Sequence, residues 1–154
     1  MEIPGVIKPM NINKQFCIRI KEALLVRYLT NECKKGIVKS PLKRGIYCAV
    51  KLRYIDTDCL LCIALNKREV IRYFLFNAKK AENPKELIYE LCDFAKENNA
   101  DRLILSKKAV SEEDFPYTAA LALYFKDELK RRGISLIGYY LTDGADFENL
   151  ITDT

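Results

Sequence analysis

The side chains best suited to chemistry lie in one polar stretch, Lys107 to Tyr117, which follows the apolar segment Arg102 to Ser106. In an α/β sheet, the loop leaving the carboxyl end of a strand is where ligands and catalytic groups usually lie. The cluster Glu112, Glu113 and Asp114 could hold a hard cation there or act as acid and base. Acidic residues just before a helix are also typical of a solvated first turn, which the helix dipole stabilises. We favour the solvated turn.

Two further motifs could carry chemistry. Lys107 and Lys108 stand together at the end of the expected strand, where they could receive a phosphate, although surface solubility is the interpretation we favour. Cys59-x-x-Cys62 has a metal-like spacing, but residues three apart on a strand point to opposite faces. No second cysteine pair or histidine completes four ligands. We therefore expect both cysteines to be small buried hydrophobic residues.

The chain contains no histidine, which excludes histidine-bearing zinc sites and Ser-His or Cys-His catalytic pairs. Its six cysteines lie mostly inside apolar runs, and no basic-then-apolar leader follows Met1. No apolar run approaches the roughly 20 residues that span a bilayer. These features predict a reduced, cytoplasmic protein without a membrane segment.

The net charge of +5 is concentrated near the N-terminus. Residues 1–45 carry ten Lys or Arg against three Glu, whereas residues 46–154 carry sixteen against eighteen acids. A basic segment with interleaved aromatic residues is one signature of nucleic-acid binding, although such faces are often only solvated. The candidate nucleic-acid contacts within residues 8–44 are Lys14, Arg19, Lys21, Arg27, Lys34, Lys35, Lys39, Lys43 and Arg44.

The periodicity of apolar residues predicts an α/β protein with a mixed sheet and helices on both faces. Residues 41–54 are ambiguous, because Ser40-Pro41 reads as a helix start while the alternation near Val50 reads as a strand. Cys59 to Leu65 is apolar throughout and should be a central strand. The other expected helices cover 15–35, the segment from the capping-box start at Asn83 to Asn98-Asn99, and 119–132, where Gly133 ends the helix. Residues 59–65 and 70–76 should form a hairpin, and further strands should cover 102–106 and 134–142. An edge segment over 147–151 should follow an Asp143-Gly144 turn.

From about Val38 to Leu150, this order of elements and several short segments resemble the RadC-like branch of the JAB/MPN domain family, the JAMM metallohydrolases. The matching segments, in chain order, are Ser40-Pro41, Lys51 to Arg53, Leu60 to Leu65 with Asn66 to Arg68, Asn83 to Glu86, Ala100 to Ser106, Arg131 to Ile134, and Gly138 to Gly144. The resemblance implies a three-layer α/β/α, cytidine-deaminase-like architecture for residues 37–154. Outside the resemblance, the composition and apolar spacing of residues 1–36 predict a basic N-terminal arm and helix, within one compact unit overall. The resemblance also favours a helix over residues 41–54.

Family members bind one zinc ion through a His-x-His pair and an Asp, with a Glu that assists a bound water. In this chain the resemblance places Lys107 and Ala109 at the histidine positions, and Thr118 near the Asp position, with Asp114 as the nearest acid. Ser111 lies in the Pro-Ser-Gly match, and Asp58 takes the place of the Glu. A lysine ammonium repels a cation by direct charge repulsion. We therefore expect a vestigial groove without metal or cofactor, in which Lys107 pairs with Asp58.

These expectations describe a pseudoenzyme: a metal-free, non-catalytic RadC-like domain that binds a protein partner or itself. The first alternative is a nucleic-acid-associated protein of DNA-repair type that uses the basic residues 8–44. The second alternative is a hydrolase with a relocated site that uses Asp58 and the acids Glu112 to Asp114.

Overall fold

The computed structural model describes residues 33–55, 57–77, 83–108 and 115–151. The strand β1 (Cys59–Leu65) lies in the interior of its sheet. All seven residues of β1 are buried, because the strand is apolar on both faces and pairs on both edges. It pairs antiparallel with β2 (Val70–Asn77) through a short hairpin and antiparallel with β3 (Arg102–Lys108). The predicted hairpin and the central position of this strand are confirmed.

The remaining strands extend the sheet on the side of β3. β4 (Ser135–Thr142) pairs parallel with β3, and β5 (Phe147–Asn149) pairs antiparallel with β4 after a turn at Gly144. The strand order is β2-β1-β3-β4-β5, so that β2 and β5 are the edges. The parallel pair needs a crossover connection, which the helix α4 (Phe115–Arg131) supplies.

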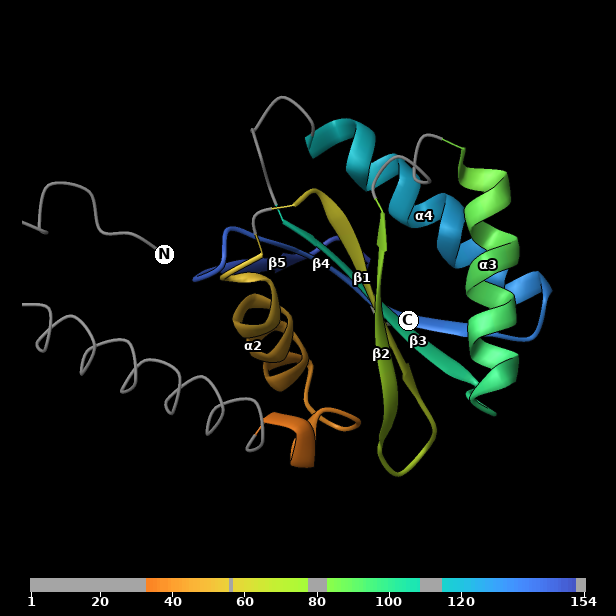
Figure 1. Cartoon of the computed structure of the whole chain (residues 1–154), viewed down its shortest axis with the longest axis horizontal. Coiled ribbons are helices and arrows are strands. Elements are labelled where there is room, and N and C mark those ends of the chain that lie inside the picture. Colours follow the sequence, from red (N-terminus) through yellow and green to blue (C-terminus); the bar gives the residue numbers. More distant parts are fainter. Residues whose placement is uncertain (1–32, 56, 78–82, 109–114, 152–154) are drawn as a thin grey trace, which may run out of the picture.

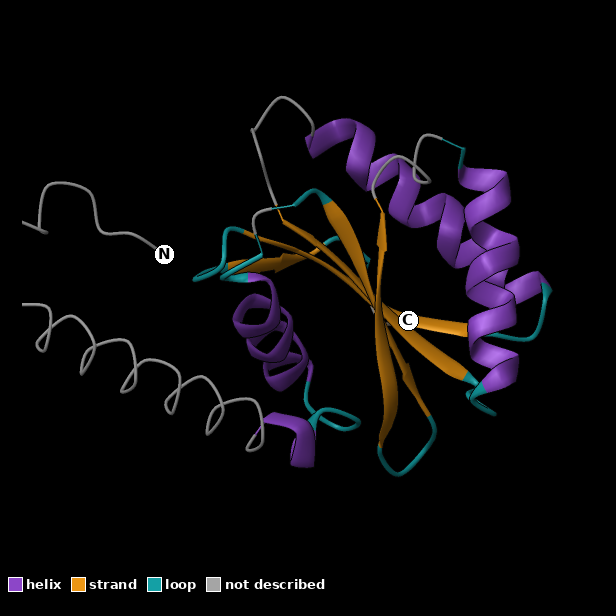
Figure 2. Ribbon diagram, in the orientation of Figure 1, coloured by secondary structure: helices purple, strands orange, loops and turns teal. Residues whose placement is uncertain are grey.

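Helices cover both faces of this mixed sheet, as the sequence predicted (Figures 1 and 2). α2 (Pro41–Leu52) lies on one face, where Leu52 packs with Leu61 and Ile63. α3 (Pro84–Glu97) and α4 lie on the other face, where Leu91 and Phe125 pack over alternate residues of the same strands. Each strand of the sheet centre therefore contributes to two apolar cores, one under each helical layer.

The ambiguous segment 41–54 is a helix up to Leu52. Ser40 is its N-cap, and the Ser40 hydroxyl accepts a hydrogen bond from the Lys43 backbone N–H at 3.2 Å. Gly45 lies against the ring of Phe147, so a side chain at this position would overlap the ring. The alternating pattern near Val50 is overridden by this cap and by close helix-to-strand packing.

Several predicted boundaries need correction. α4 begins at Phe115 rather than at Ala119, and Lys107 and Lys108 belong to β3 rather than to a loop. Asn83 is the N-cap of α3, but its side chain makes no capping hydrogen bond. Gly133 follows α4 with φ of +80°, as expected of a C′ glycine. Of the helix expected over 15–35, only 33–35 fall within the described residues, and they are helical.

Candidate functional site

Asp58 and Lys107 meet at one end of the sheet. Asp58 immediately precedes β1, and Lys107 lies opposite Leu60 in the antiparallel β1–β3 ladder. This register brings the Lys107 Nζ to 3.9 Å from the Asp58 Oδ1, which confirms the predicted ion pair. The side chains of Lys107 and Asp58 are 29% and 58% exposed, so the pair is solvated. An ion pair of this kind contributes at most about 1 kcal/mol to stability.

The neighbouring tyrosine Tyr139 completes the surroundings of Asp58. Burial raises the pKa of the Tyr139 hydroxyl, and the negative charge of Asp58 raises it further. The Tyr139 ring stacks on Phe125 of α4 at a centroid distance of 6.5 Å and an interplanar angle of 6°. Sequence reasoning missed Tyr139, although its position in an apolar run, typical of a strand buried on both faces, was a signal that it faces a core.

Lys108 points to the other face of the sheet, because successive residues of a strand alternate. Its Nζ donates to the backbone oxygens of Arg53 and Ile55, at 3.1 and 3.3 Å, where α2 ends. A cation at the C-terminal end of a helix is favoured by the helix dipole. Lys107 and Lys108 therefore do not form a single phosphate site, and that candidate interpretation was wrong.

The other residues of the expected groove are described only in part. Thr118 is buried in α4, and its side chain carries a neutral hydroxyl. Ala109, Ser111 and Asp114 lie outside the described residues, as do Glu112 and Glu113. Within the described ranges, no three histidine, cysteine or acidic side chains gather as a metal-binding group would require.

The cysteines in the described part of the chain are buried, and none of them forms a disulfide there. Cys59 belongs to the core beneath α2, and Cys62 belongs to the core beneath α3 and α4. The two therefore lie on opposite faces, as predicted, and cannot share a metal ion. Burial raises the pKa of the Cys62 thiol and raises that of Cys48 to about 12, so neither is an activated nucleophile.

Arg44 is not a nucleic-acid contact, and this prediction was wrong. The side chain is 6% exposed, its Nε donates to the Ile37 carbonyl at 2.8 Å, and its Nη2 donates to the Val38 carbonyl at 2.6 Å. Arg44 thereby holds the turn that precedes α2. The other described candidates are exposed: Lys34, Lys35, Lys39 and Lys43. Lys14, Arg19, Lys21 and Arg27 lie outside the described residues.

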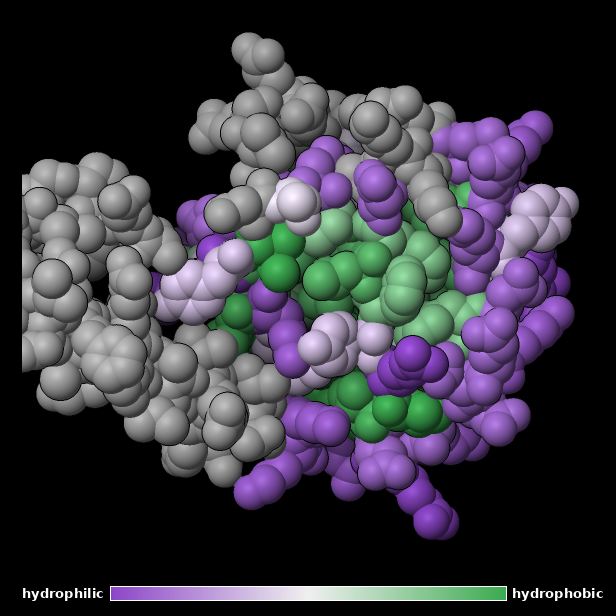
Figure 3. All heavy atoms as spheres, viewed as in Figure 1, coloured by the Kyte–Doolittle hydropathy of each residue, from purple (hydrophilic) through white to green (hydrophobic). Residues whose placement is uncertain are grey.

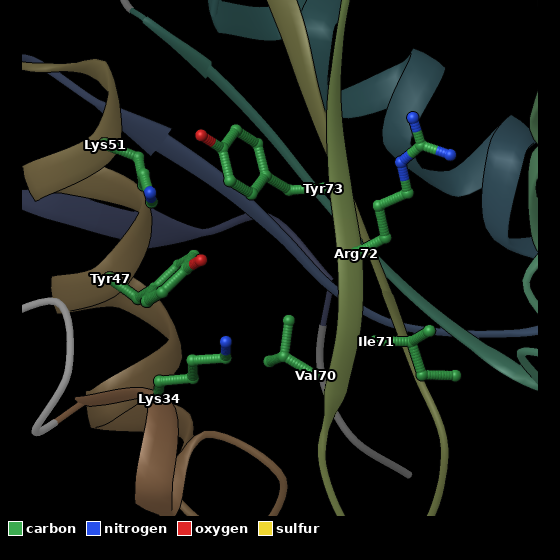
Figure 4. A pocket seen from close by; sticks show the side chains of 7 residues that line it. All are labelled: Lys34, Tyr47, Lys51, Val70, Ile71, Arg72 and Tyr73. Carbon is green, nitrogen blue, oxygen red and sulfur yellow. The ribbon is translucent and has the colours of Figure 1, made fainter.

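A cavity of about 400 Å³, which sequence reasoning also missed, lies between α2 and the edge strand β2 (Figure 4). The Lys51 Nζ lies 4.2 Å from the centroid of the Tyr73 ring and 5.5 Å from that of Tyr47. Both are cation–π contacts. The sequence offers no signal for this cavity, because a helix and a strand from different parts of the chain form its walls.

No protein-family model matches this chain, and no curated protein matches it. Among the residues that the structure describes, the helices are too short or too polar to cross a membrane.

Proposed function

We propose that the protein is a metal-free, non-catalytic RadC-like JAB/MPN domain that serves as an interaction or scaffold module. The observation that carries this proposal is the ion pair between Lys107 and Asp58, in which an ammonium occupies the position that the resemblance gives to a zinc-binding imidazole. The order of elements from α2 to β5 supports the cytidine-deaminase-like architecture that the resemblance implies.

The donor set at this position does not fit zinc. A tetrahedral catalytic zinc site needs three side-chain ligands and an open position for water. Lys107 is cationic, Thr118 is neutral and buried, and Asp58 is the one carboxylate among these described side chains. A zinc ion here would have to displace the ammonium from Asp58 with no imidazole available anywhere in the chain.

The same ion pair counts against a relocated hydrolase site, because Asp58 already has a cationic partner. The cytoplasmic location remains part of our proposal and is supported by the buried thiols of the described residues, which form no disulfide there.

An activity assay tests the non-catalytic assignment. The purified chain, supplied with zinc, is incubated with an isopeptide-linked, a peptide and a nucleic-acid substrate, and we expect no turnover. Asp58→Ala is the matched variant. Hydrolysis that Asp58→Ala abolishes would contradict the proposal, whereas hydrolysis equal in both proteins would indicate a contaminating enzyme.

Nucleic-acid binding is the second candidate function. The observation that favours it is the exposure of four lysines, Lys34, Lys35, Lys39 and Lys43, within ten residues of the chain (34–43). Phosphate contacts predict an affinity for DNA or RNA that falls steeply with salt. Fluorescence anisotropy in about 50 and 200 mM salt tests this. The absence of binding at the lower salt would reject the candidate.

A further inference from the structure

The edge strand β2 exposes an unusual amount of apolar surface. Its exposed large side chains include Tyr73 and Phe74, at 44% and 45%, together with Ile71 and Leu75. In the space-filling view, hydrophobic residues gather over β2, and hydrophilic residues border them (Figure 3). β2 pairs only with β1 among the described strands, so its outer edge presents backbone N–H and C=O groups without a strand partner there. Such an edge is a template for pairing with another extended chain.

The cavity beside α2 includes this edge. The four consecutive residues 70–73 all line it, and a register shift in the β1–β2 pairing at this point interrupts the alternation of their side chains. In Figure 4, Val70 and Tyr73 point toward α2, whereas Arg72 points away from it. The main chain of β2 is therefore itself part of the cavity wall. A ligand in the cavity would contact the strand edge and the side chains of α2 together.

The cavity is positively charged. Lys34 and Lys51 line it on the α2 side, whereas the side chain of Arg72 points away from α2, so these two lysines supply its charge. Within the described residues, its lining includes no acidic side chain. Lys51 is held by the Tyr47 and Tyr73 rings rather than by a carboxylate. A cation in a partly desolvated cavity favours an anionic group from a ligand.

We infer that β2 and this cavity bind an extended acidic peptide, which adds as a strand to the β2 edge and places carboxylates beside Lys51 and Lys34. Main-chain hydrogen bonds to the edge supply affinity, and side chains in pockets supply specificity. Because successive peptide side chains alternate, carboxylates on the α2 side alternate with apolar groups on the side of Phe74. The expected ligand is thus a segment in which acidic and apolar residues alternate.

Charge disfavours the two other occupants of the edge. Residues 1–32 of this chain carry five Lys or Arg against three Glu, so they do not complement a basic cavity. A second copy that paired its own β2 with this one would bring two basic cavities, each lined by Lys34 and Lys51, together with like charges. The acidic peptide is the occupant that complements the described surface.

The test uses the full chain and a fluorescein-labelled, capped eight-residue peptide in which glutamate and valine alternate. One control peptide has lysine in place of glutamate, and a second is N-methylated at every residue, so that neither of its edges can donate a hydrogen bond to a strand. The protein variants are Lys51→Met and, as the matched control on the opposite helical layer, Lys96→Met. Fluorescence anisotropy measures the affinity, and amide chemical shifts locate the peptide.

We expect binding with a Kd below about 100 µM, shifts centred on residues 70–77, and loss of binding for both control peptides. Lys51→Met should weaken binding roughly tenfold, since one charge-assisted contact is lost, and Lys96→Met should leave it unchanged. Absence of binding at about 1 mM peptide, equal binding of the N-methylated peptide, or a dimer whose β2 edges are already paired would each overturn the inference.

This inference names a partner class for the interaction module proposed above and rests on that proposal. Different results would overturn the proposed function and the inference about the β2 edge. A hydrolytic zinc site at Lys107 would overturn the proposed function. Failure of the peptide to bind at β2 would overturn only the inference about the edge.

Discussion

Replacing Arg44 with methionine should destabilise the whole domain. The Arg44 side chain is buried and donates from Nε to the Ile37 carbonyl and from Nη2 to the Val38 carbonyl. Methionine fills a similar volume but donates no hydrogen bond, so both carbonyls lose this partner. Ile37 itself is fully buried in the core beneath α2, and the loss therefore affects a segment that packs into the domain centre.

The magnitude follows from the two bonds. A hydrogen bond to a charged group contributes about 1.5–3 kcal/mol, and removal of a buried charge offsets part of that loss by relieving its desolvation cost. We expect a net loss of about 2–4 kcal/mol. For a chain of this length, each kcal/mol lowers Tm by about 2–4 °C.

Urea denaturation followed by circular dichroism measures this change. Lys43→Met is the matched control, because Lys43 is the exposed neighbour on the same helix and should change stability by less than about 0.5 kcal/mol. A loss below about 1 kcal/mol for Arg44→Met would refute the structural role of Arg44. Weaker nucleic-acid binding by a fully stable Arg44→Met protein would restore it as a contact residue.

Three further predictions concern the packing, the ion pair and the thiols. Gly45→Ala should destabilise the protein by about 1–3 kcal/mol despite the higher helix propensity of alanine, because the methyl group overlaps the Phe147 ring. Adding Phe147→Leu to Gly45→Ala should recover part of the lost stability, measured as the midpoint of urea denaturation. A Gly45→Ala protein more stable than the original would contradict this packing. A double-mutant cycle of Asp58→Asn and Lys107→Met should give a coupling energy below about 1 kcal/mol, because both side chains reach solvent; a coupling above about 2 kcal/mol would show that the pair is shielded. Cys62 should resist iodoacetamide at pH 8 in the native protein and react in urea, because burial raises the thiol pKa and lowers the thiolate fraction; mass spectrometry that finds native Cys62 alkylated would contradict this.

The sequence predicted the elements whose signals are local. Cys59 to Leu65 is apolar throughout, and this alone indicates a strand buried on both faces. The start of α4 was placed too late, at Ala119 instead of Phe115. Proline is compatible with a first helical turn, so Pro116 was a signal for the earlier start.

The candidate site was predictable only where strand pairing is simple. The pair of Asp58 and Lys107 was expected from the resemblance, and the antiparallel ladder of β1 and β3 produces it. Arg44 was misassigned because charge in a sequence does not indicate burial: the turn before α2 folds back to supply its carbonyl partners. The Lys51–Tyr73 contact depends on how α2 packs beside a hairpin edge, which no local pattern encodes.

The zinc content of the purified chain tests the central claim most directly. The protein is produced in zinc-supplemented medium, purified without chelators, and analysed by elemental mass spectrometry with its concentration measured independently. Because the proposed resemblance places Lys107 at a zinc-ligand position and Lys107 pairs with Asp58, we predict fewer than about 0.1 zinc ions per chain. A value near one zinc per chain, lost on substitution of Asp58, would contradict the account.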